Sequence, residues 1–250
     1  MAGHSKWKKI KHQKGATDAK RGQLFTKLAR EIAVVVREGG PNVDGNYRLR
    51  LVVQKARDSN MPLDNIERAI KRGAGGEGEV LEEVTYECYG PGGVALMLTT
   101  LTSNRKRTVG EIRATLVRAG GSLGEAGCVA WNFEAKGVIT LEADKEKAEE
   151  VALLAIDAGA DDVKVDEGFV EVYTTGENLE HARKALEDNG VKVDSAELSM
   201  VPKTSVTVSA KEAEQTLRLL DALEELDDVS KVYSNADFPD EVLEQYQRAG

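Results

Sequence analysis

Side chains that carry redox, nucleophilic or metal chemistry are scarce in this sequence. Its 250 residues include two cysteines and three histidines. There is no Cys-x-x-Cys pair, and His4, His12 and His181 are not spaced as a ligand set for zinc. No glycine-rich loop joins a predicted strand to a helix, as a nucleotide phosphate site requires. The sequence therefore predicts a protein that is not an enzyme and has no cofactor, no metal and no small-molecule substrate.

Long apolar runs are missing as well. None approaches the roughly eighteen residues that a membrane span needs. The basic start of the chain is not followed by the apolar core of a secretory signal. Cys88 and Cys128, the two cysteines, suit a reducing compartment in which buried thiols stay free rather than form a disulfide. We therefore expect a cytoplasmic protein with no membrane partner.

Positive charge is concentrated at one end of the chain. The net charge is −9, yet residues 1–75 contain 17 Lys and Arg against 7 Asp and Glu, whereas the rest contains 17 against 36. Nucleic acid is attracted by the basic part and repelled by the acidic part. This distribution predicts that the protein binds a polyanion by one end only.

The basic residues are densest in the first thirty, where nine lysines and arginines accompany one acid, Asp18. A solvated, disordered terminus is the alternative interpretation of such a tail. However, Trp7 and Ile10 lie among the lysines, and an exposed Trp is unfavourable unless it stacks on or packs against another surface. We expect this arm to contact phosphates and Trp7 to meet a base or a groove wall.

Three amphipathic helical patterns accompany this basic region, each with apolar residues three and four apart. They run over residues 25–36, 49–56 and 61–73. Their short connections predict a three-helix bundle as an N-terminal domain over residues 1–76. The glycines of residues 73–79 match GxGxxG, but they follow a helix and precede a strand, so this segment is interpreted as a linker.

From residue 80 apolar and polar residues alternate, as in β-strands. The predicted order of elements is ββαβ in residues 80–134, βαββαβ in 135–203 and βαβ in 204–250. The middle group has the order of a ferredoxin-like unit, whereas the other two are too small to bury their own faces. We therefore predict an α+β multidomain protein in which the ferredoxin-like domain is inserted between the two halves of another α+β domain. Three consecutive domains would leave both halves poorly covered.

Individual strands are predicted from the same alternation. Within the ferredoxin-like domain we expect two neighbouring strands, at 162–165 and 169–174. Just before that domain we expect a strand at Cys128–Phe133.

Arg105, Lys106 and Arg107 form a second basic cluster, just before a helix that we expect from about Thr108. Backbone N–H groups at a helix start favour anions, and adjacent guanidinium groups strengthen that preference. The alternative is that these are simply soluble residues at a helix start. The loop Gly90–Gly93 can also bring backbone close to a phosphate, but a hairpin turn is the simpler interpretation.

Two other pairs of cations lie on the predicted helices. Arg48 and Arg50 are candidates for phosphate contact on the second helix. Lys71 and Arg72, which end the third helix, are further candidates, but they have a competing role because cations stabilise a helix C-terminus without any ligand.

Several longer motifs resemble the YebC family. They are AGHSKW at 2–7, KxxxDAKRGQLFTKL around 14–28, GGPN at 39–42, NMPLDNIERAIKRGAG at 60–75, YGPGG at 89–93 and NRKRT at 104–108. The resemblance implies a helical N-terminal domain and a ferredoxin-like domain inserted into an α+β domain, which agrees with the pattern above. Three residues depart from the family pattern: Cys88 replaces an expected glycine, and Ser103 and Lys106 replace an acid and an amide.

The resemblance also implies a function. Family members are described as cytoplasmic DNA-binding transcriptional regulators. Some, together with the similar mitochondrial translational activator of cytochrome c oxidase subunit I, are described instead as ribosome-associated translation factors that relieve stalling at proline runs.

These observations predict a nucleic-acid-binding regulator of gene expression. Its ligand is DNA, as the resemblance implies, or rRNA and tRNA on the ribosome, because phosphate contacts without an evident helix-turn-helix suit structured RNA. A third hypothesis is a protein-interaction adaptor whose acidic C-terminal domains bind a basic partner. The residues expected to contact nucleic acid are Lys6, Trp7, Lys8, Lys9, Lys11, His12, Lys14, Lys20, Arg21, Lys27, Arg48, Arg50, Arg105, Lys106 and Arg107.

Overall fold

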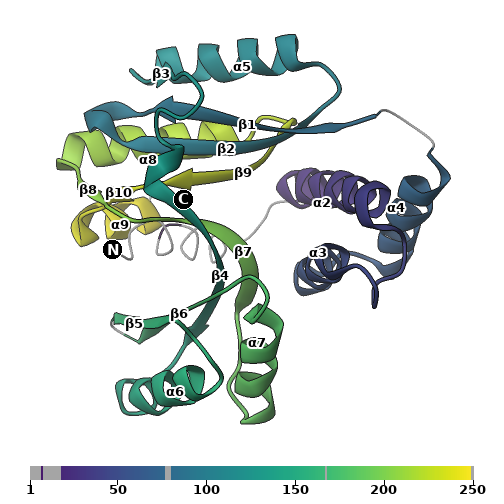
Figure 1. The fold of residues 1–250 in the computed structure, drawn as a ribbon. Coiled ribbons are helices and arrows are strands. Elements are labelled where there is room, and N and C mark those ends of the chain that lie inside the picture. The colour runs from purple at the N-terminus through teal and green to yellow at the C-terminus, as the bar shows by residue number, and fades with distance from the viewer. Residues whose placement is uncertain (1–6, 8–17, 77–79, 167, 249–250) are drawn as a thin grey trace. The chain divides into compact units, whose positions relative to one another are not determined.

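A computed structural model describes residues 7, 18–76, 80–166 and 168–248 of the chain (Figure 1). These residues fall into two compact units. The first comprises Met1–Val52, Met61–Phe133 and Pro202–Gly250, and the second comprises Val53–Asn60 and Glu134–Val201. The mixed α+β class, with a helical region followed by sheet domains, is confirmed, whereas the domain boundaries predicted above stay a prediction.

The helical region consists of α2 (Asp18–Gly39), α3 (Tyr47–Asp58) and α4 (Leu63–Gly75). Helices α2 and α4 pack against each other along their apolar faces, and Leu28, Ile32 and Ile66 are buried. At Gly73 the two backbones come so close that a Cβ atom would lie 2.8 Å from the carbonyl oxygen of Ala33. Glycine at this position therefore sets how closely α4 lies against α2.

A buried asparagine fixes the turn between α2 and α3. Asn46 donates from Nδ2 to the carbonyl oxygens of Val35 and Gly40, at 3.0 and 2.9 Å. Its Oδ1 accepts a hydrogen bond from the backbone N–H of Leu49 at 3.1 Å, which satisfies a free donor in the first turn of α3.

The first sheet domain begins with β1 (Glu82–Tyr89), the 3-10 turn η1 (Pro91–Gly93), β2 (Ala95–Thr102), α5 (Arg105–Arg118), β3 (Ser122–Leu123) and the 3-10 turn η2 (Ala130–Asn132). Its second half contains β8 (Val206–Thr207), α8 (Ala210–Glu224), β9 (Val229–Ser234), β10 (Ala236–Asp237) and α9 (Asp240–Arg248). The four-stranded sheet has the order β3-β1-β2-β9, so strands from the two halves pair directly. The two halves therefore form one domain around one core.

That core joins side chains from both halves. Leu96 and Leu98 of β2, Ile112 of α5 and Leu217 and Leu220 of α8 belong to one buried cluster. In the same domain the thiol of Cys88 is fully buried, and burial raises its pKa to about 12. Cys88 and Cys128 are both free thiols.

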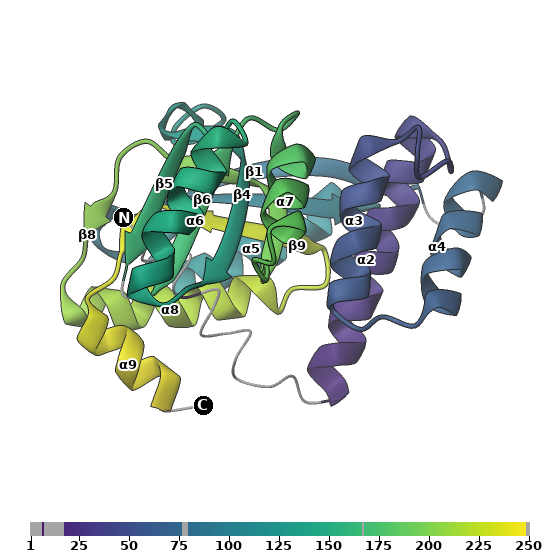
Figure 2. The same ribbon diagram turned by 90° about the horizontal axis from the view of Figure 1, so that it is seen from below.

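The inserted domain contains β4 (Phe133–Glu142), α6 (Lys145–Asp157), β5 (Asp162–Asp166), β6 (Phe169–Thr174), α7 (Leu179–Asp188) and β7 (Ser195–Pro202). Its sheet order, β5-β6-β4-β7, is that of the ferredoxin-like βαββαβ unit. Figure 2 looks onto α6 and α7, which contact each other on one face of this sheet. The strands predicted at 162–165 and 169–174 are confirmed.

The strand predicted at Cys128–Phe133 is wrong, since a loop and η2 precede β4 there. The carboxylate of Glu87 accepts hydrogen bonds from the backbone N–H groups of Gly127, Val129 and Ala130, at 2.6 to 2.7 Å. These donors are therefore not available to a sheet ladder. Partial burial by itself would raise the pKa of Glu87. The three hydrogen bonds to its carboxylate have a larger combined effect, so the pKa lies below its ordinary value.

Candidate nucleic-acid interface

Most of the basic arm lies outside the described residues. This applies to Lys6, Lys8, Lys9, Lys11, His12 and Lys14, whose predicted contacts with nucleic acid stay predictions. Lys20 and Arg21 are described, and both are exposed in the first turn of α2.

Trp7 does not have the exposed position that the sequence suggested. Its side chain is 0% exposed and belongs to the core cluster of the first sheet domain, with Val242 and Leu243 of α9. Tyr246 packs against the same cluster. The pKa of Tyr246 is raised, mainly by burial and to a smaller extent by its hydrogen bond to Asp221. The prediction that Trp7 stacks on a base is therefore wrong. The indole ring meets the protein's own core, which satisfies its need for an apolar surface.

Lys27 also serves the fold. Its Nζ donates to the backbone carbonyl oxygens of Leu226 and Val229, each at 2.8 Å, and to that of Glu224 at 2.5 Å. These carbonyls lie at the C-terminal end of α8, where a cation is favourable, in the loop that follows and at the first residue of β9. Lys27 thus joins α2 to the first sheet domain rather than presenting its charge to a phosphate.

The cluster at the start of α5 is largely paired with carboxylates. Arg105 contacts Glu82 at 2.6 Å and Arg107 contacts Asp228 at 2.7 Å. The helix begins at Arg105, earlier than predicted, because Asn104 caps it by accepting a hydrogen bond from the N–H of Arg107. Lys106 is exposed and has no ion pair within the described part of the chain.

The two arginines of α3 differ in exposure. Arg48 is paired with Glu38 at 2.6 Å and with Glu83 at 3.1 Å. Arg50 is half-buried. Neither arginine therefore presents a fully exposed guanidinium group, without a carboxylate partner, to a phosphate.

Asp228, in the loop before β9, organises the charges around the start of α5. It is 2% exposed, and its Oδ2 accepts hydrogen bonds from Thr102 and Thr108 as well as from Arg107. Its Oδ1 lies 3.5 Å from a guanidinium nitrogen of Arg30 on α2. Burial by itself would raise the pKa of Asp228. The hydrogen bonds from Arg107 and Thr108 and the charges of Arg107 and Arg30 have a larger combined effect, so the pKa lies below its ordinary value. The ionised carboxylate therefore holds α2, α5 and β9 together.

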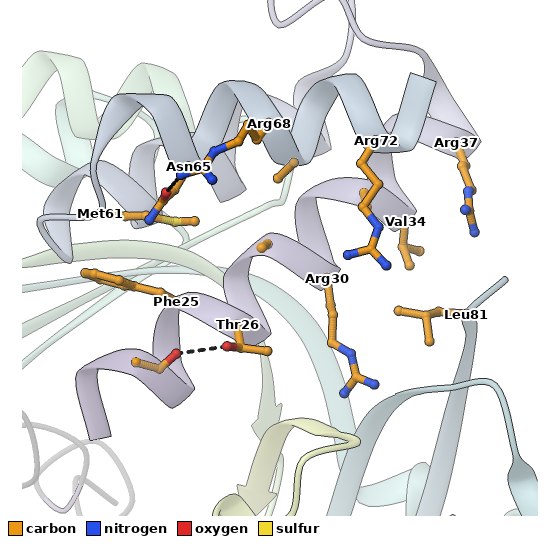
Figure 3. Close-up of a pocket in the computed structure, with 14 residues that line it drawn as sticks. Phe25, Thr26, Arg30, Val34, Arg37, Met61, Asn65, Arg68, Arg72 and Leu81 are labelled. Carbon is orange, nitrogen blue, oxygen red and sulfur yellow. Dashed lines mark hydrogen bonds between the residues drawn. The ribbon is translucent and has the colours of Figure 1, made fainter. Parts of the chain in front are cut away.

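A hollow of about 690 Å³ lies between α2 and α4. We call it the α2–α4 groove. Four arginines line it, and there is no Asp or Glu among its fourteen lining residues; the arginines are Arg30 and Arg37 from α2 and Arg68 and Arg72 from α4. Figure 3 shows Arg72 extending from α4 toward α2, whereas Arg30 extends from α2 away from α4, in agreement with its contact with Asp228.

Sequence reasoning missed this groove as a site. The sequence places Arg30 in the basic arm and makes Arg72 a candidate for phosphate contact with a competing role at a helix end, but it does not indicate that the two line one groove. Arg30 and Arg37 are seven residues apart and Arg68 and Arg72 four apart, so each pair lies on one helical face. That spacing marks two cationic stripes, but their meeting depends on how α2 and α4 pack.

Metal binding and membrane insertion find no support in the described residues. No group of three or more His, Cys, Asp or Glu side chains there is arranged to hold a metal ion. No helix in the same residues is long and apolar enough to cross a membrane.

Two family models together match most of the chain. Residues 5–76 match the "TACO1/YebC protein N-terminal domain", and residues 81–236 match the "TACO1/YebC second and third domain". The chain belongs to the TACO1/YebC family. The resemblance drawn from its motifs is confirmed, and the two matched segments meet at the linker after α4.

Relatives in the TACO1/YebC family carry a regulatory name. A "Probable transcriptional regulatory protein" of Dehalococcoides mccartyi is 56% identical over 98% of both chains. Another of the same name, from Herpetosiphon aurantiacus, is 50% identical over 100% of both chains. The crystal structure of a conserved hypothetical protein from Aquifex aeolicus is similar, with a TM-score of 0.81 and 46% identity, over 89% of this chain and 92% of that one.

Proposed function

We propose that this chain is a non-enzymatic regulator of gene expression that binds nucleic acid through its N-terminal helical region. The α2–α4 groove carries the proposal, because four arginines line it and no carboxylate does. Arg30 pairs with Asp228. However, the described partners of Arg68 are uncharged and Arg72 has no ion pair within the described residues, so these two guanidinium groups can pair with a polyanion. The names of the relatives support transcriptional regulation. The proposal takes DNA as the ligand and the cytoplasm as the site of action. No cofactor or small-molecule substrate is part of the proposal.

The cations divide into two roles under this proposal. Those that bind are the arm lysines, Lys20, Arg21, Lys106 and three groove arginines, Arg37, Arg68 and Arg72, whereas the fourth, Arg30, contacts Asp228. Lys27, Arg105 and Arg107 instead hold the elements together through carbonyl and carboxylate partners. Phosphate contacts of this kind position a protein on nucleic acid without reading its sequence.

The test is the salt dependence of binding to duplex DNA. With about eight phosphate contacts, the logarithm of the association constant should fall with the logarithm of salt at a slope near −7. Replacing Lys8, Lys9 and Lys11 together by Gln should reduce the slope by about 2.7. A matched control replaces Lys147, Lys184 and Lys192 by Gln, three exposed lysines of the inserted domain, and should leave the slope unchanged.

Two outcomes would overturn the proposal. A slope near zero for the unmodified protein would show that phosphates are not bound. Equal losses in the arm variant and the control would show that net charge alone, rather than the N-terminal region, governs binding. Full function without nucleic-acid binding would favour the protein-interaction adaptor.

A second candidate is a ribosome-associated translation factor that contacts rRNA or tRNA and relieves stalling at proline runs. One feature favours it: the arginines line a hollow instead of forming an exposed helix face that fits the major groove of duplex DNA. This candidate predicts that the protein co-sediments with ribosomes at low salt and leaves them when Lys8, Lys9 and Lys11 are neutralised. A protein found only in the ribosome-free fraction, with a footprint on promoter DNA, would exclude it.

A further inference from the structure

We propose that the α2–α4 groove holds an unpaired nucleotide of a single-stranded nucleic acid, with its base inside and the flanking phosphates on the arginines. This inference rests on the proposed function and specifies the form of nucleic acid that the groove accepts. It arises from two properties of the lining that occur together: a charged rim and an apolar, partly aromatic interior.

The rim is suited to phosphates. The described partners of Arg68 are uncharged: the backbone oxygen of Asp64 and the side-chain amide of Asn65. Arg72 is exposed at the end of α4 and has no ion pair within the described part of the chain. By contrast, Arg48, Arg105 and Arg107 each lie within 2.7 Å of a carboxylate oxygen. Guanidinium groups left without carboxylates are the natural partners of phosphate oxygens.

The spacing of the cations exceeds the size of one phosphate. Arg68 and Arg72 are four residues apart on α4, which corresponds to about 6 Å along the helix axis, and Arg37 lines the same groove from α2. One phosphate cannot satisfy all three of these cations. A continuous strand, which carries a phosphate at every nucleotide, can do so, and we therefore infer a strand rather than a free nucleotide.

The interior is suited to a base. Phe25, Met61, Val34 and Leu81 line the groove together with the small side chains of Ala29, Ala33 and Ala69. Figure 3 shows Phe25 and Met61 at one end of the groove. Aromatic rings and thioethers favour the flat face of a base over water. A volume of about 690 Å³ falls in the range of small-ligand sites.

The shape of the groove determines whether it can accept a single-stranded or a duplex nucleic acid. In a duplex the bases face each other and their flat faces are covered by neighbours, so none can enter a lateral hollow without flipping out. For an unpaired base, entering the groove costs only the small free energy of unstacking from its neighbours. The groove should therefore bind single strands in preference to duplexes of equal length.

The experiment measures the affinity of the full chain for a labelled single-stranded oligonucleotide and for the matching duplex, by fluorescence anisotropy at several salt concentrations. Arg68→Gln with Arg72→Gln should weaken single-strand binding about twentyfold at 0.1 M salt and reduce the slope by about 1.4. The control, Arg113→Gln with Arg118→Gln, removes two exposed arginines from α5 and should change neither.

Phe25→Leu separates stacking from charge. It keeps an apolar side chain at this half-buried position, so the helical region stays folded, which circular dichroism checks. Single-strand affinity should fall about tenfold while the salt slope and duplex affinity stay unchanged. Equal effects of Phe25→Leu on both nucleic acids, or no effect on either, would overturn the nucleotide site.

The outcomes separate this inference from the function on which it rests. Absence of binding to every nucleic acid by the unmodified protein would overturn the proposed function itself. If binding depends on salt but neither groove variant weakens it more than the control does, the nucleotide site is overturned and the proposed function stands. Complete displacement of the oligonucleotide by a millimolar nucleoside monophosphate would show a site for a free nucleotide and would also overturn it.

Discussion

The start of α5 and the α2–α4 groove are both rich in arginine, but their charges have different roles. At α5, Arg105 and Arg107 are two residues apart in the sequence, and each lies against a carboxylate. In the groove, Arg68 and Arg72 have no carboxylate partner within the described residues, and no carboxylate lines the space between α2 and α4. The density of basic residues in a sequence therefore does not indicate which charges are available to a ligand. The positions of the acids decide it.

The same contrast applies within the N-terminal region. Trp7 and the lysines around it are neighbours in sequence, yet Trp7 is fully buried in the core of the first sheet domain. One segment therefore contributes to the core through its aromatic residue, whereas its lysines are proposed to bind phosphates. Deleting the whole arm would mix these two effects, so neutral substitutions of its lysines are the cleaner test.

The largest effect is expected from Trp7→Ala. Removing a fully buried Trp leaves a large cavity, and we expect a loss of about 4 kcal/mol in the free energy of unfolding. Urea unfolding followed by circular dichroism measures it, with Lys8→Gln as a control that should change stability by less than about 0.5 kcal/mol. Equal stability of Trp7→Ala and the unmodified protein would show that the ring is not part of the core.

Asp228→Asn should have the next largest effect. It keeps the shape of the side chain but removes the charge that Arg107 and Arg30 share, and we expect a loss of about 3 kcal/mol in the free energy of unfolding at pH 7. The measurement is again urea unfolding, and Asp227→Asn, in the same loop, is the matched control.

The pH dependence of the Asp228 variant has a definite sign. Because the pKa of Asp228 is lowered in the folded state, its stabilisation is fully present above the ordinary carboxyl pKa and is lost as the pH falls through the lower folded value. The stability difference between the two proteins should therefore be constant from pH 5 to 7 and shrink below about pH 4. A difference that grows on acidification would contradict an ionised Asp228.

The smallest effects come from one arginine of each cluster, compared directly. Arg72→Gln should weaken single-strand binding about fivefold at 0.1 M salt, because one phosphate contact is lost. Arg105→Gln should leave binding unchanged, since its guanidinium is paired with Glu82. Both side chains are exposed, so neither substitution should change stability by more than about 0.5 kcal/mol. Equal losses of binding would erase the distinction between the two clusters.

Local patterns were sufficient for most of the fold. The alternation at 169–174 predicted β6 to the residue, and the order βαββαβ identified the ferredoxin-like domain. The same reasoning failed at Cys128–Phe133, where a distant carboxylate, Glu87, takes the backbone donors that a strand would use. It also gave no indication of the short helix α9, which covers Trp7 from the other end of the chain.

The candidate site was less predictable than the fold. The sequence showed that cations gather near the N-terminus, but it did not show that Lys27 donates to three carbonyl oxygens more than 190 positions away. Nor did it show that Arg107 shares a buried carboxylate with Arg30. Long-range pairing of this kind depends on which loops fold next to each other.

The sequence by itself determined the α+β class, the inserted ferredoxin-like unit, the family and the basic end of the chain, because periodicity, length and charge are properties of neighbouring residues. Only the tertiary structure decided that Trp7 belongs to the core, that the arginines of α5 are paired and that those of α2 and α4 line a common groove. The physical reason is that burial and charge pairing depend on distances in space, and these arise only after distant segments have packed together.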